Sequence, residues 1–218
     1  AIYYFINSNY FCLEEITIEG NEHIPIVELE GIIGVEKGIN LWQVDTKIIE
    51  KQLATHPLVA VSQVKRRWPR NLVIGIEERV PAAVLVQNGK FFLVDDSGVA
   101  MKKTAKISHL GLPIISGVKN LKNVVLGKKI DVPAFIAALQ VVKQIPTVDI
   151  HCLQEIRALS PSNLQLIWEG NLLVKFGDHH HVAAKLARLR DTLPGIKAGT
   201  SVEYIDVSYE GSPVVKFN

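Results

Sequence analysis

The alternating apolar residues Leu72, Ile74 and Ile76 form the clearest pattern in the chain. A period of two residues is typical of a strand with one buried face. The segment before it, Trp68–Asn71, has turn chemistry, because its proline cannot donate a hydrogen bond and keeps its predecessor extended. The run Val59–Arg67 ahead of that turn therefore predicts the partner strand of an antiparallel hairpin.

Another strand and two short helices are predicted upstream of this hairpin. The strand falls within Leu13–Glu19. The first helix begins near Pro25, which suits a first helical turn, and ends at Gly34. Asp45 or Thr46 caps the second helix. The order strand, helix, helix, strand, strand predicts a compact two-layer unit in which two helices cover three strands.

The chain beyond this unit is richer in strands. Ala83–Gln87 and Lys90–Val94 flank Asn88-Gly89, whose residues both accept a positive φ and so favour a tight hairpin. One helix is predicted to open at Asp131, and a second is predicted to be capped by Asp178. Pro146 is expected to stop the first of these helices. The further strands predicted are 99–101, 112–116, 152–158, 164–169, 172–176, 202–209 and 213–217.

These elements predict an α+β fold with two domains. The small two-layer domain covers residues 13–80. Residues 81–218 form a larger, mainly antiparallel β domain with two helices, and it ends in a terminal hairpin. A chain of 218 residues with 48% hydrophobic content is long enough to build a core in each domain.

The first residues, Ala1–Ile6, are apolar and rich in tyrosine, as the outer end of a membrane-spanning helix would be. A strand or a frayed terminus fits these residues equally well. No run in the chain approaches the ~20 apolar residues that a membrane span needs. Cys12 and Cys152 are too few for a disulfide framework, and both a single bridge and two separate thiols stay open.

A net charge of +2 is too small to indicate nucleic acid or an anionic membrane as a partner. The sharpest basic cluster is Lys65-Arg66-Arg67, followed by Trp68 and Arg70, and such a group can bind phosphate and stack on a base. However, neighbouring residues of a strand face opposite sides, which splits the cluster. Trp68 is more typical of a residue that plugs the end of a core. No nucleic acid is therefore predicted.

Catalytic chemistry finds little support in the sequence. The three consecutive side chains His179–His181 point in different directions, whereas a zinc site needs ligands that converge. Glu77 and Glu78 are neighbours on a strand and cannot act as an acid/base pair, so both are expected to face solvent or pair with arginine. No phosphate-binding or serine-hydrolase motif occurs. We predict no enzyme, catalytic residue, metal, cofactor or small-molecule substrate.

The terminal hairpin is a better candidate for function. Ile205, Val207 and Tyr209 share one face of its first strand, and Val215 and Phe217 share a face of the closing strand. A closing strand at a sheet edge can pair with a strand from a partner, with exposed aromatics as anchors. An ordinary hairpin with both aromatic residues in the core fits the pattern at least as well.

Two long segments carry a family resemblance, F-C-L-E-E-I-T-I-E-G-N-E-H-I at residues 11–24 and H-P-L-V-A-V-S-Q-V-K-R-R-W-P-R-N-L-V-I-G-I-E-E-R-V-P-A-A at residues 56–83. They are followed by F-L-V-D-D-S-G-V-A, L-P-I-I-S-G, V-K-F-G and Y-I-D-V-S-Y-E-G-S-P-V-V-K-F. Together these segments resemble the FtsQ/DivIB family of bacterial division proteins, over nearly the whole chain and in the family's order. Residues 13–80 would then be its polypeptide-transport-associated (POTRA) domain.

The resemblance implies a cell-membrane protein with a short cytoplasmic tail and one membrane helix, at the division septum. This chain would be the extracytoplasmic part, with residues 1–12 as the end of the membrane helix and the juxtamembrane segment. The implied role is a non-catalytic scaffold of the divisome. Its implied partners are FtsL and FtsB/DivIC-like proteins, with septal peptidoglycan synthases as further candidates.

In this family the terminal hairpin binds the FtsB/DivIC-like partner by strand addition. The residues that the resemblance places at or beside this site are Tyr204, Asp206, Val207, Tyr209, Val214, Val215, Lys216 and Phe217. This chain departs from the family pattern at Ser208, where an arginine is common, and at Phe217, where a tryptophan is common.

Two other function classes compete with the scaffold. One is a POTRA-bearing outer-membrane assembly or secretion factor that binds client strands through the same edge chemistry, although such proteins usually carry several such units or a barrel. The other is a hydrolase that uses His179–His181. A spanning helix in the upstream sequence would favour the scaffold, and a cleaved signal peptide would favour the assembly factor.

Overall fold

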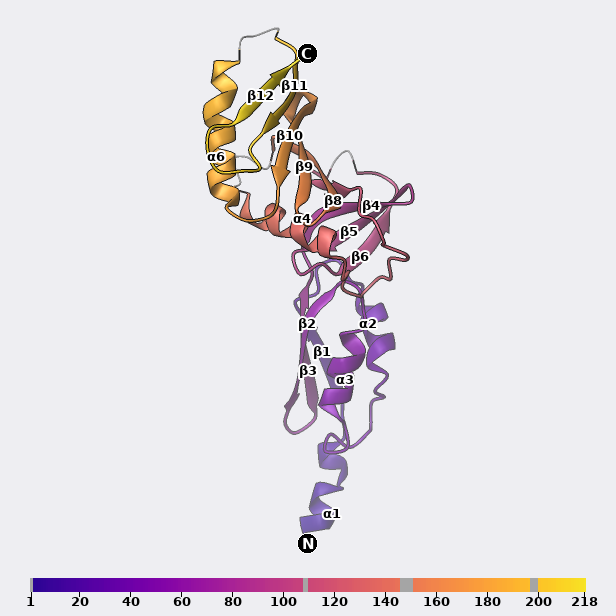
Figure 1. Ribbon diagram of the computed structural model, residues 1–218. Helices are drawn as coiled ribbons and strands as arrows, with labels where there is room; N and C mark the ends of the chain where they lie inside the picture. The colour runs from indigo at the N-terminus through magenta and orange to yellow at the C-terminus, as the bar shows by residue number, and fades with distance from the viewer. Residues whose placement is uncertain (1, 108–109, 146–150, 197–199) are drawn as a thin grey trace. The chain divides into compact units, whose positions relative to one another are not determined.

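A computed structural model of the chain describes residues 2–107, 110–145, 151–196 and 200–218 (Figure 1). The chain divides into two compact units, unit 1 from Ala1 to Arg79 and unit 2 from Val80 to Asn218. Each unit has its own hydrophobic core, and the two sets of core residues do not overlap.

Unit 1 contains a three-stranded sheet with the strand order β1-β3-β2. The central strand β3 runs parallel to β1 and antiparallel to β2. The predicted order of strands and helices is confirmed. The elements are α1 (Ile2–Ile6), η1 (Asn9–Phe11), β1 (Glu15–Glu19), α2 (Ile26–Ile33), α3 (Thr46–Leu53), β2 (Val59–Arg67) and β3 (Asn71–Glu78).

Local sequence chemistry explains the boundaries of the helices in unit 1. Asp45 caps α3, and its carboxylate accepts hydrogen bonds from the backbone N–H groups of Lys47 and Ile48. Gly34 ends α2 in the left-handed conformation with φ 59°, which glycine adopts without steric cost. The buried core combines one face of β3 with residues of both helices. Its helix and β3 members are Leu29, Ile33, Ile49, Leu53, Leu72, Ile74 and Ile76.

Unit 2 is built on a nine-stranded sheet in the described residues, with the order β12-β11-β10-β9-β8-β7-β4-β5-β6. Five of its junctions are antiparallel, and β4–β7, β7–β8 and β10–β11 are parallel. The elements are β4 (Pro81–Gln87), β5 (Lys90–Asp95), β6 (Ala100–Thr104), β7 (Ile114–Ser116), α4 (Pro133–Gln144), β8 (Leu153–Ser160), β9 (Asn163–Trp168), η2 (Glu169–Asn171), β10 (Leu172–Gly177), α6 (Val182–Thr192), η3 (Leu193–Gly195), β11 (Val202–Asp206) and β12 (Val214–Phe217).

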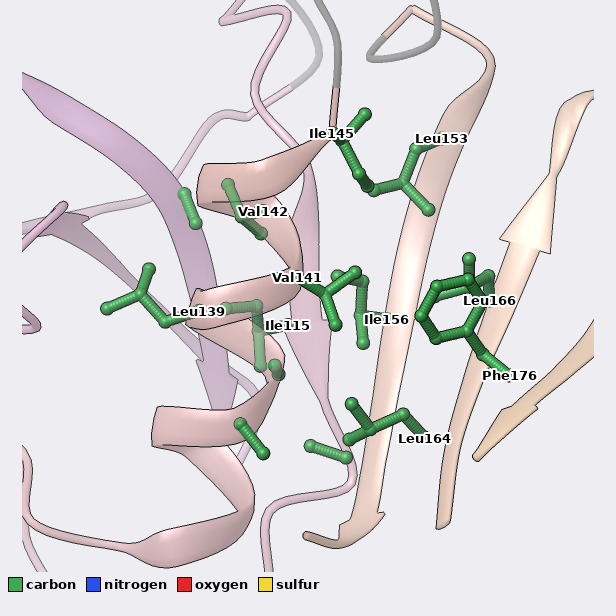
Figure 2. Close-up of a cluster of buried hydrophobic side chains, with 14 of the residues drawn as sticks. Ile115, Leu139, Val141, Val142, Ile145, Leu153, Ile156, Leu164, Leu166 and Phe176 are labelled. Atoms are coloured by element: carbon green, nitrogen blue, oxygen red, sulfur yellow. The ribbon is translucent and has the colours of Figure 1, made fainter. Parts of the chain in front are cut away.

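The core of unit 2 lies between its sheet and α4, with α6 packed into the same core. Figure 2 shows Val141 of α4 directed toward Ile156 of β8, whereas Leu139 lies on the other side of the helix. The labelled strand residues of this core that are fully buried are Ile115, Ile156, Leu164, Leu166 and Phe176. An α+β fold, with a small three-stranded unit followed by a larger and mainly antiparallel one, is therefore confirmed.

The two helices in unit 2 begin later than predicted. Helix α4 begins at Pro133, two residues after Asp131, with Val132 as its N-cap. Helix α6 begins after His181, which has a φ of 52°. The Asp178 carboxylate instead accepts a hydrogen bond from Lys185 Nζ at 2.7 Å, which lowers the pKa of Asp178. Pro146, the predicted stop of α4, lies outside the described residues.

Candidate partner-binding site

Strand β12 lies at one end of the nine-stranded sheet and, within the described part of the chain, pairs only with β11. The two strands are antiparallel, with Tyr204 opposite Lys216, Ile205 opposite Val215 and Asp206 opposite Val214. In an edge strand, alternate backbone N–H and C=O groups point away from the sheet. β12 therefore offers backbone donors and acceptors to a further strand.

Residues directly opposite one another share a face, so the register divides the hairpin into two faces. Ile205 is buried, and Val215 packs partly buried against the core, which makes this the inner face. Tyr204 and Lys216 lie on the outer face, together with Asp206 and Val214. The outer face is the polar side of the hairpin, while the inner face holds it to unit 2.

Two lysines flank the ring of Tyr204 on the outer face. Lys175 Nζ of β10 lies 3.5 Å from the ring centroid, and Lys216 Nζ of β12 lies 5.7 Å from it. Lys216 also forms an ion pair with Glu203 at 2.6 Å, and this hydrogen bond raises the pKa of Lys216. The ring of Tyr204 is therefore flanked by two ammonium groups, while Asp206 on the same face and Glu203, the partner of Lys216, supply negative charge beside them.

Helix α6 holds the turn between β11 and β12 through Arg188. Its guanidinium donates to the backbone carbonyls of Tyr209 at 2.6 Å, Gly211 at 2.9 Å and Val207 at 3.2 Å. The planar fork of an arginine can reach several acceptors at once. Arg188 therefore fixes the course of the chain as it enters β12.

Two further features fix the start of the same turn: hydrogen bonds between Asp206 and Ser208, and the close approach of β10 at Gly177. Asp206 Oδ1 accepts hydrogen bonds from the backbone N–H of Ser208 at 2.9 Å and from its hydroxyl at 2.7 Å. Gly177, with φ 81°, lies so close that an added Cβ would stand 2.9 Å from the Ser208 Cβ. A glycine is required at this contact, both for its backbone angle and for the space.

The structure separates the predicted site residues by exposure. Tyr209, Val214 and Phe217 are 46%, 47% and 52% exposed. The aromatic residues of the hairpin are thus outside the core. Val207 is only 1% exposed, so its side chain belongs to the core and is not available to a partner in this conformation. Tyr204, Asp206 and Val215 are half-buried, and Lys216 is exposed.

Sequence reasoning missed Arg188, Lys175 and Glu203 at this hairpin. Lys175 could have been predicted, because it lies between the buried residues Val174 and Phe176 of β10 and so must face the opposite side of the sheet. No sequence signal indicated Arg188, because its three acceptors are backbone carbonyls at positions 207–211.

Other candidate chemistry is used within the fold or does not converge. Arg66 donates to the carbonyls of Leu41 and Val44, and Arg70 donates to backbone carbonyls near the start of unit 1. The rings of His179 and His180 contact each other with centroids 4.3 Å apart and planes tilted by 34°. Among the residues described, no group of three or more His, Cys, Asp or Glu could hold a metal ion. In the same residues no helix has the length and apolar content to cross a membrane.

Comparison with known proteins gives matches to both units. A family model described as "POTRA domain, FtsQ-type" matches residues 11–79, and one described as "Cell division protein FtsQ/DivIB, C-terminal" matches residues 83–208. The "Cell division protein FtsQ" of Syntrophotalea carbinolica is 27% identical over 216 residues, which cover 97% of this chain and 76% of that protein.

Two further relatives differ in how much of their length is matched. The "Cell division protein DivIB" of Clostridium tetani is 22% identical over 216 residues, covering 94% of this chain and 79% of that protein. The "Cell division protein FtsQ" of Anaeromyxobacter sp. is 36% identical over 107 residues, covering 49% of this chain and 36% of that protein.

Proposed function

This chain belongs to the FtsQ/DivIB family of bacterial cell division proteins, and we propose that it is a non-catalytic scaffold that promotes assembly of the septal division complex. In this proposal it binds FtsL and FtsB/DivIC-like proteins through its extracytoplasmic domains, and it is held in the cell membrane at the septum by an upstream spanning helix. Septal peptidoglycan synthases are further candidates for its partners.

One observation carries this proposal, the open edge of β12 with one exposed aromatic residue in the strand and another in the turn that precedes it. Tyr209 lies before the strand and Phe217 in it, both about half exposed. Strand addition draws its affinity from backbone hydrogen bonds and its specificity from side-chain contacts. Exposed aromatic side chains at such an edge supply the anchors that dominate many interfaces.

The charged side chains on the outer face of the hairpin favour partner strands with complementary charges. Lys175 and Lys216 lie beside Tyr204. Complementary charge speeds encounter and fixes the register of a partner strand. We therefore propose that the added strand carries charges complementary to those of Lys175, Lys216 and Asp206 on the side that meets this face.

The alternative role, an outer-membrane assembly or secretion factor, accounts only for the POTRA unit. The match of residues 83–208 to the C-terminal part of division proteins favours the division role.

The test is calorimetric titration of the chain with a peptide from the membrane-distal part of the FtsB/DivIC-like partner. Phe217→Ala is expected to weaken binding by about 1–3 kcal/mol, because it removes an anchor and leaves the core intact. Leu126→Ala is the control, since Leu126 is 41% exposed in the same unit and lies outside the hairpin. Equal affinity of the Phe217→Ala and control variants would refute the assignment of this site.

A further inference from the structure

Five aromatic rings meet at one end of unit 1, and we call them the aromatic cluster. They come from α1, from η1, from the loop ahead of α3 and from the β2–β3 turn, and α1 and this turn lie at the same end of the unit (Figure 1). The rings are those of Phe5, Tyr10, Phe11, Trp42 and Trp68. Centroid distances between neighbours run from 4.3 Å for Trp42 and Trp68 to 6.2 Å for Phe5 and Tyr10.

The aromatic cluster is a surface patch and not a part of the core. Phe5 is 58% exposed, Tyr10 54%, Trp42 51% and Trp68 43%, and none of these residues is in the buried core of unit 1. Trp68 was predicted to plug the end of the core, but it lies at the surface, where its ring contacts that of Trp42 at an interplanar angle of 39°. Exposed aromatic residues that gather in one patch mark an interaction surface more often than single ones do.

Backbone contacts hold the patch in place. Arg70 donates to the carbonyls of Asn9 and Tyr10 at 3.1 and 3.3 Å, which ties η1 to the β2–β3 turn. Asn40 donates from its side chain to the Ile6 carbonyl at 2.8 Å, which ties the end of α1 to the loop ahead of α3. The rings are therefore presented by a formed surface.

Basic side chains accompany the aromatic cluster. Arg67 is exposed directly before Trp68. Lys37 and Arg70 line a shallow hollow with Asn9, next to Tyr10 in the chain. Acidic groups lie at this end too: Glu36 is beside Lys37, Glu14 pairs with Arg70 at 2.9 Å, and Glu15 accepts a hydrogen bond from Asn71 at 3.1 Å. The cluster also continues into α1, which carries no charged residue.

We propose that the aromatic cluster rests on the headgroup region of a lipid bilayer. Tryptophan and tyrosine concentrate at membrane–water interfaces, where the apolar ring enters the boundary and the N–H or O–H stays hydrated. Arg67 and Lys37 contact lipid phosphates in this arrangement. The uncharged helix α1, which supplies Phe5, lies on the same surface. This contact is separate from the hairpin site in unit 2 and does not depend on it.

The three tryptophans of the chain provide a direct measurement. Trp42 and Trp68 are in the aromatic cluster, whereas Trp168 is 4% exposed in the core of unit 2. The chain is mixed with vesicles of equal parts phosphatidylcholine and phosphatidylglycerol, with and without bromine on the acyl chains. Brominated vesicles are expected to quench emission from Trp42 and Trp68. In a Trp42→Phe/Trp68→Phe variant only Trp168 remains, and no quenching is expected.

Vesicle sedimentation measures the contribution of the rings and the charges. Trp42→Ala/Trp68→Ala is expected to lower the partition coefficient by about tenfold or more, since two large aromatic surfaces no longer enter the boundary. Arg67→Glu leaves the rings in place and is expected to weaken binding to the anionic vesicles more than to pure phosphatidylcholine. Val27→Ala is the control, since Val27 is 78% exposed on α2 of the same unit and lies outside the aromatic cluster. This variant should bind vesicles as the unchanged chain does.

The outcomes separate the membrane from other occupants of the patch. Quenching together with loss in the tryptophan variant but not in the Val27→Ala control supports the proposal. The proposal is wrong if the unchanged chain does not sediment with vesicles, or if the tryptophan variant binds as well as the control. Concentration-dependent dimerisation that the tryptophan variant abolishes, without vesicle binding, would assign the patch to a second copy of the chain and overturn the proposal.

Discussion

At the scale of single residues, Glu78 joins parts of unit 1 that are far apart in sequence. Its carboxylate accepts hydrogen bonds from the backbone N–H groups of residues 22–24, each at 2.9 Å, and its side chain is 11% exposed. Burial is the largest influence and raises the pKa of Glu78. The hydrogen bonds together outweigh it, so that the pKa lies below its ordinary value of 4.5. The ionised carboxylate therefore stabilises the turn between β1 and α2.

Glu78→Gln is expected to lower the stability of unit 1 by about 1–3 kcal/mol at neutral pH, because an amide is a weaker acceptor for three N–H groups. Since the folded-state pKa is depressed, the stabilisation is complete above the unfolded value of 4.5 and is lost as the pH falls through the lower folded value. Urea unfolding between pH 3 and pH 7 checks both effects, with stability of the variant varying less in the acidic range.

Glu77→Gln is the matched control for this change, because Glu77 is the exposed neighbour on the same strand. It should leave both the stability and its pH dependence nearly unchanged. An equal loss in the two variants would show that the hydrogen bonds of Glu78 contribute little.

The surroundings of Glu77 could be predicted from the sequence, whereas those of Glu78 could not. Strand alternation correctly places them on opposite sides of β3. The expectation of solvent or an arginine partner fits the exposure of Glu77, but Glu78 is bound by backbone groups 54–56 residues away. Sequence patterns report the periodicity of a strand, whereas tertiary contact with a distant turn leaves no periodic signal.

At the scale of elements, helix α6 acts on the edge strand through Arg188. The helix packs into the core through Val182, Leu186 and Leu189, and Arg188 extends from it to three carbonyls of the β11–β12 turn. The turn is therefore held from a rigid element. Such support pre-orders an edge before a partner strand binds, which reduces the entropy lost on binding.

Arg188→Ala is expected to raise amide hydrogen exchange in residues 208–213 and to weaken binding of the partner peptide by a few-fold, with retained secondary structure. Arg188→Lys keeps the charge, but its single ammonium cannot span three carbonyls, so it should resemble the alanine variant. Exchange measured by mass spectrometry, together with the calorimetric titration, checks this. Full protection of the turn in the lysine variant would mean that charge alone suffices.

The elements also show which parts of the fold the sequence specifies. The β4–β5 hairpin was predicted from Asn88-Gly89, and both residues have the expected positive φ, 51° and 68°. The parallel pairing of β7 with β4 and β8 was not predicted, because a three-residue strand carries too little pattern to name its neighbours. The position of β12 at the sheet edge likewise depends on the order of all the strands. The sequence of the terminal hairpin alone therefore could not decide whether its aromatic residues are exposed or buried.

At the scale of the whole molecule, the chain is two compact units with one core each. Leu29 is fully buried in unit 1 and Leu166 is fully buried in unit 2. The proposed contacts are divided in the same way, with the aromatic cluster in unit 1 and the edge strand in unit 2. Because the cores share no residue, damage to one core should not reach the site of the other unit.

Leu29→Ala and Leu166→Ala test this independence in the intact chain. Each is expected to cost about 2–5 kcal/mol in its own unit, because it removes buried methyl groups and leaves a cavity. Hydrogen exchange should then rise across residues 2–79 in the first variant, and across the described part of 80–218 in the second. Leu29→Ala should retain peptide binding at β12, and Leu166→Ala should retain vesicle binding through the aromatic cluster. If either change raises exchange equally in both units, the two cores unfold as one cooperative body and the assignment of separate functions to separate units fails.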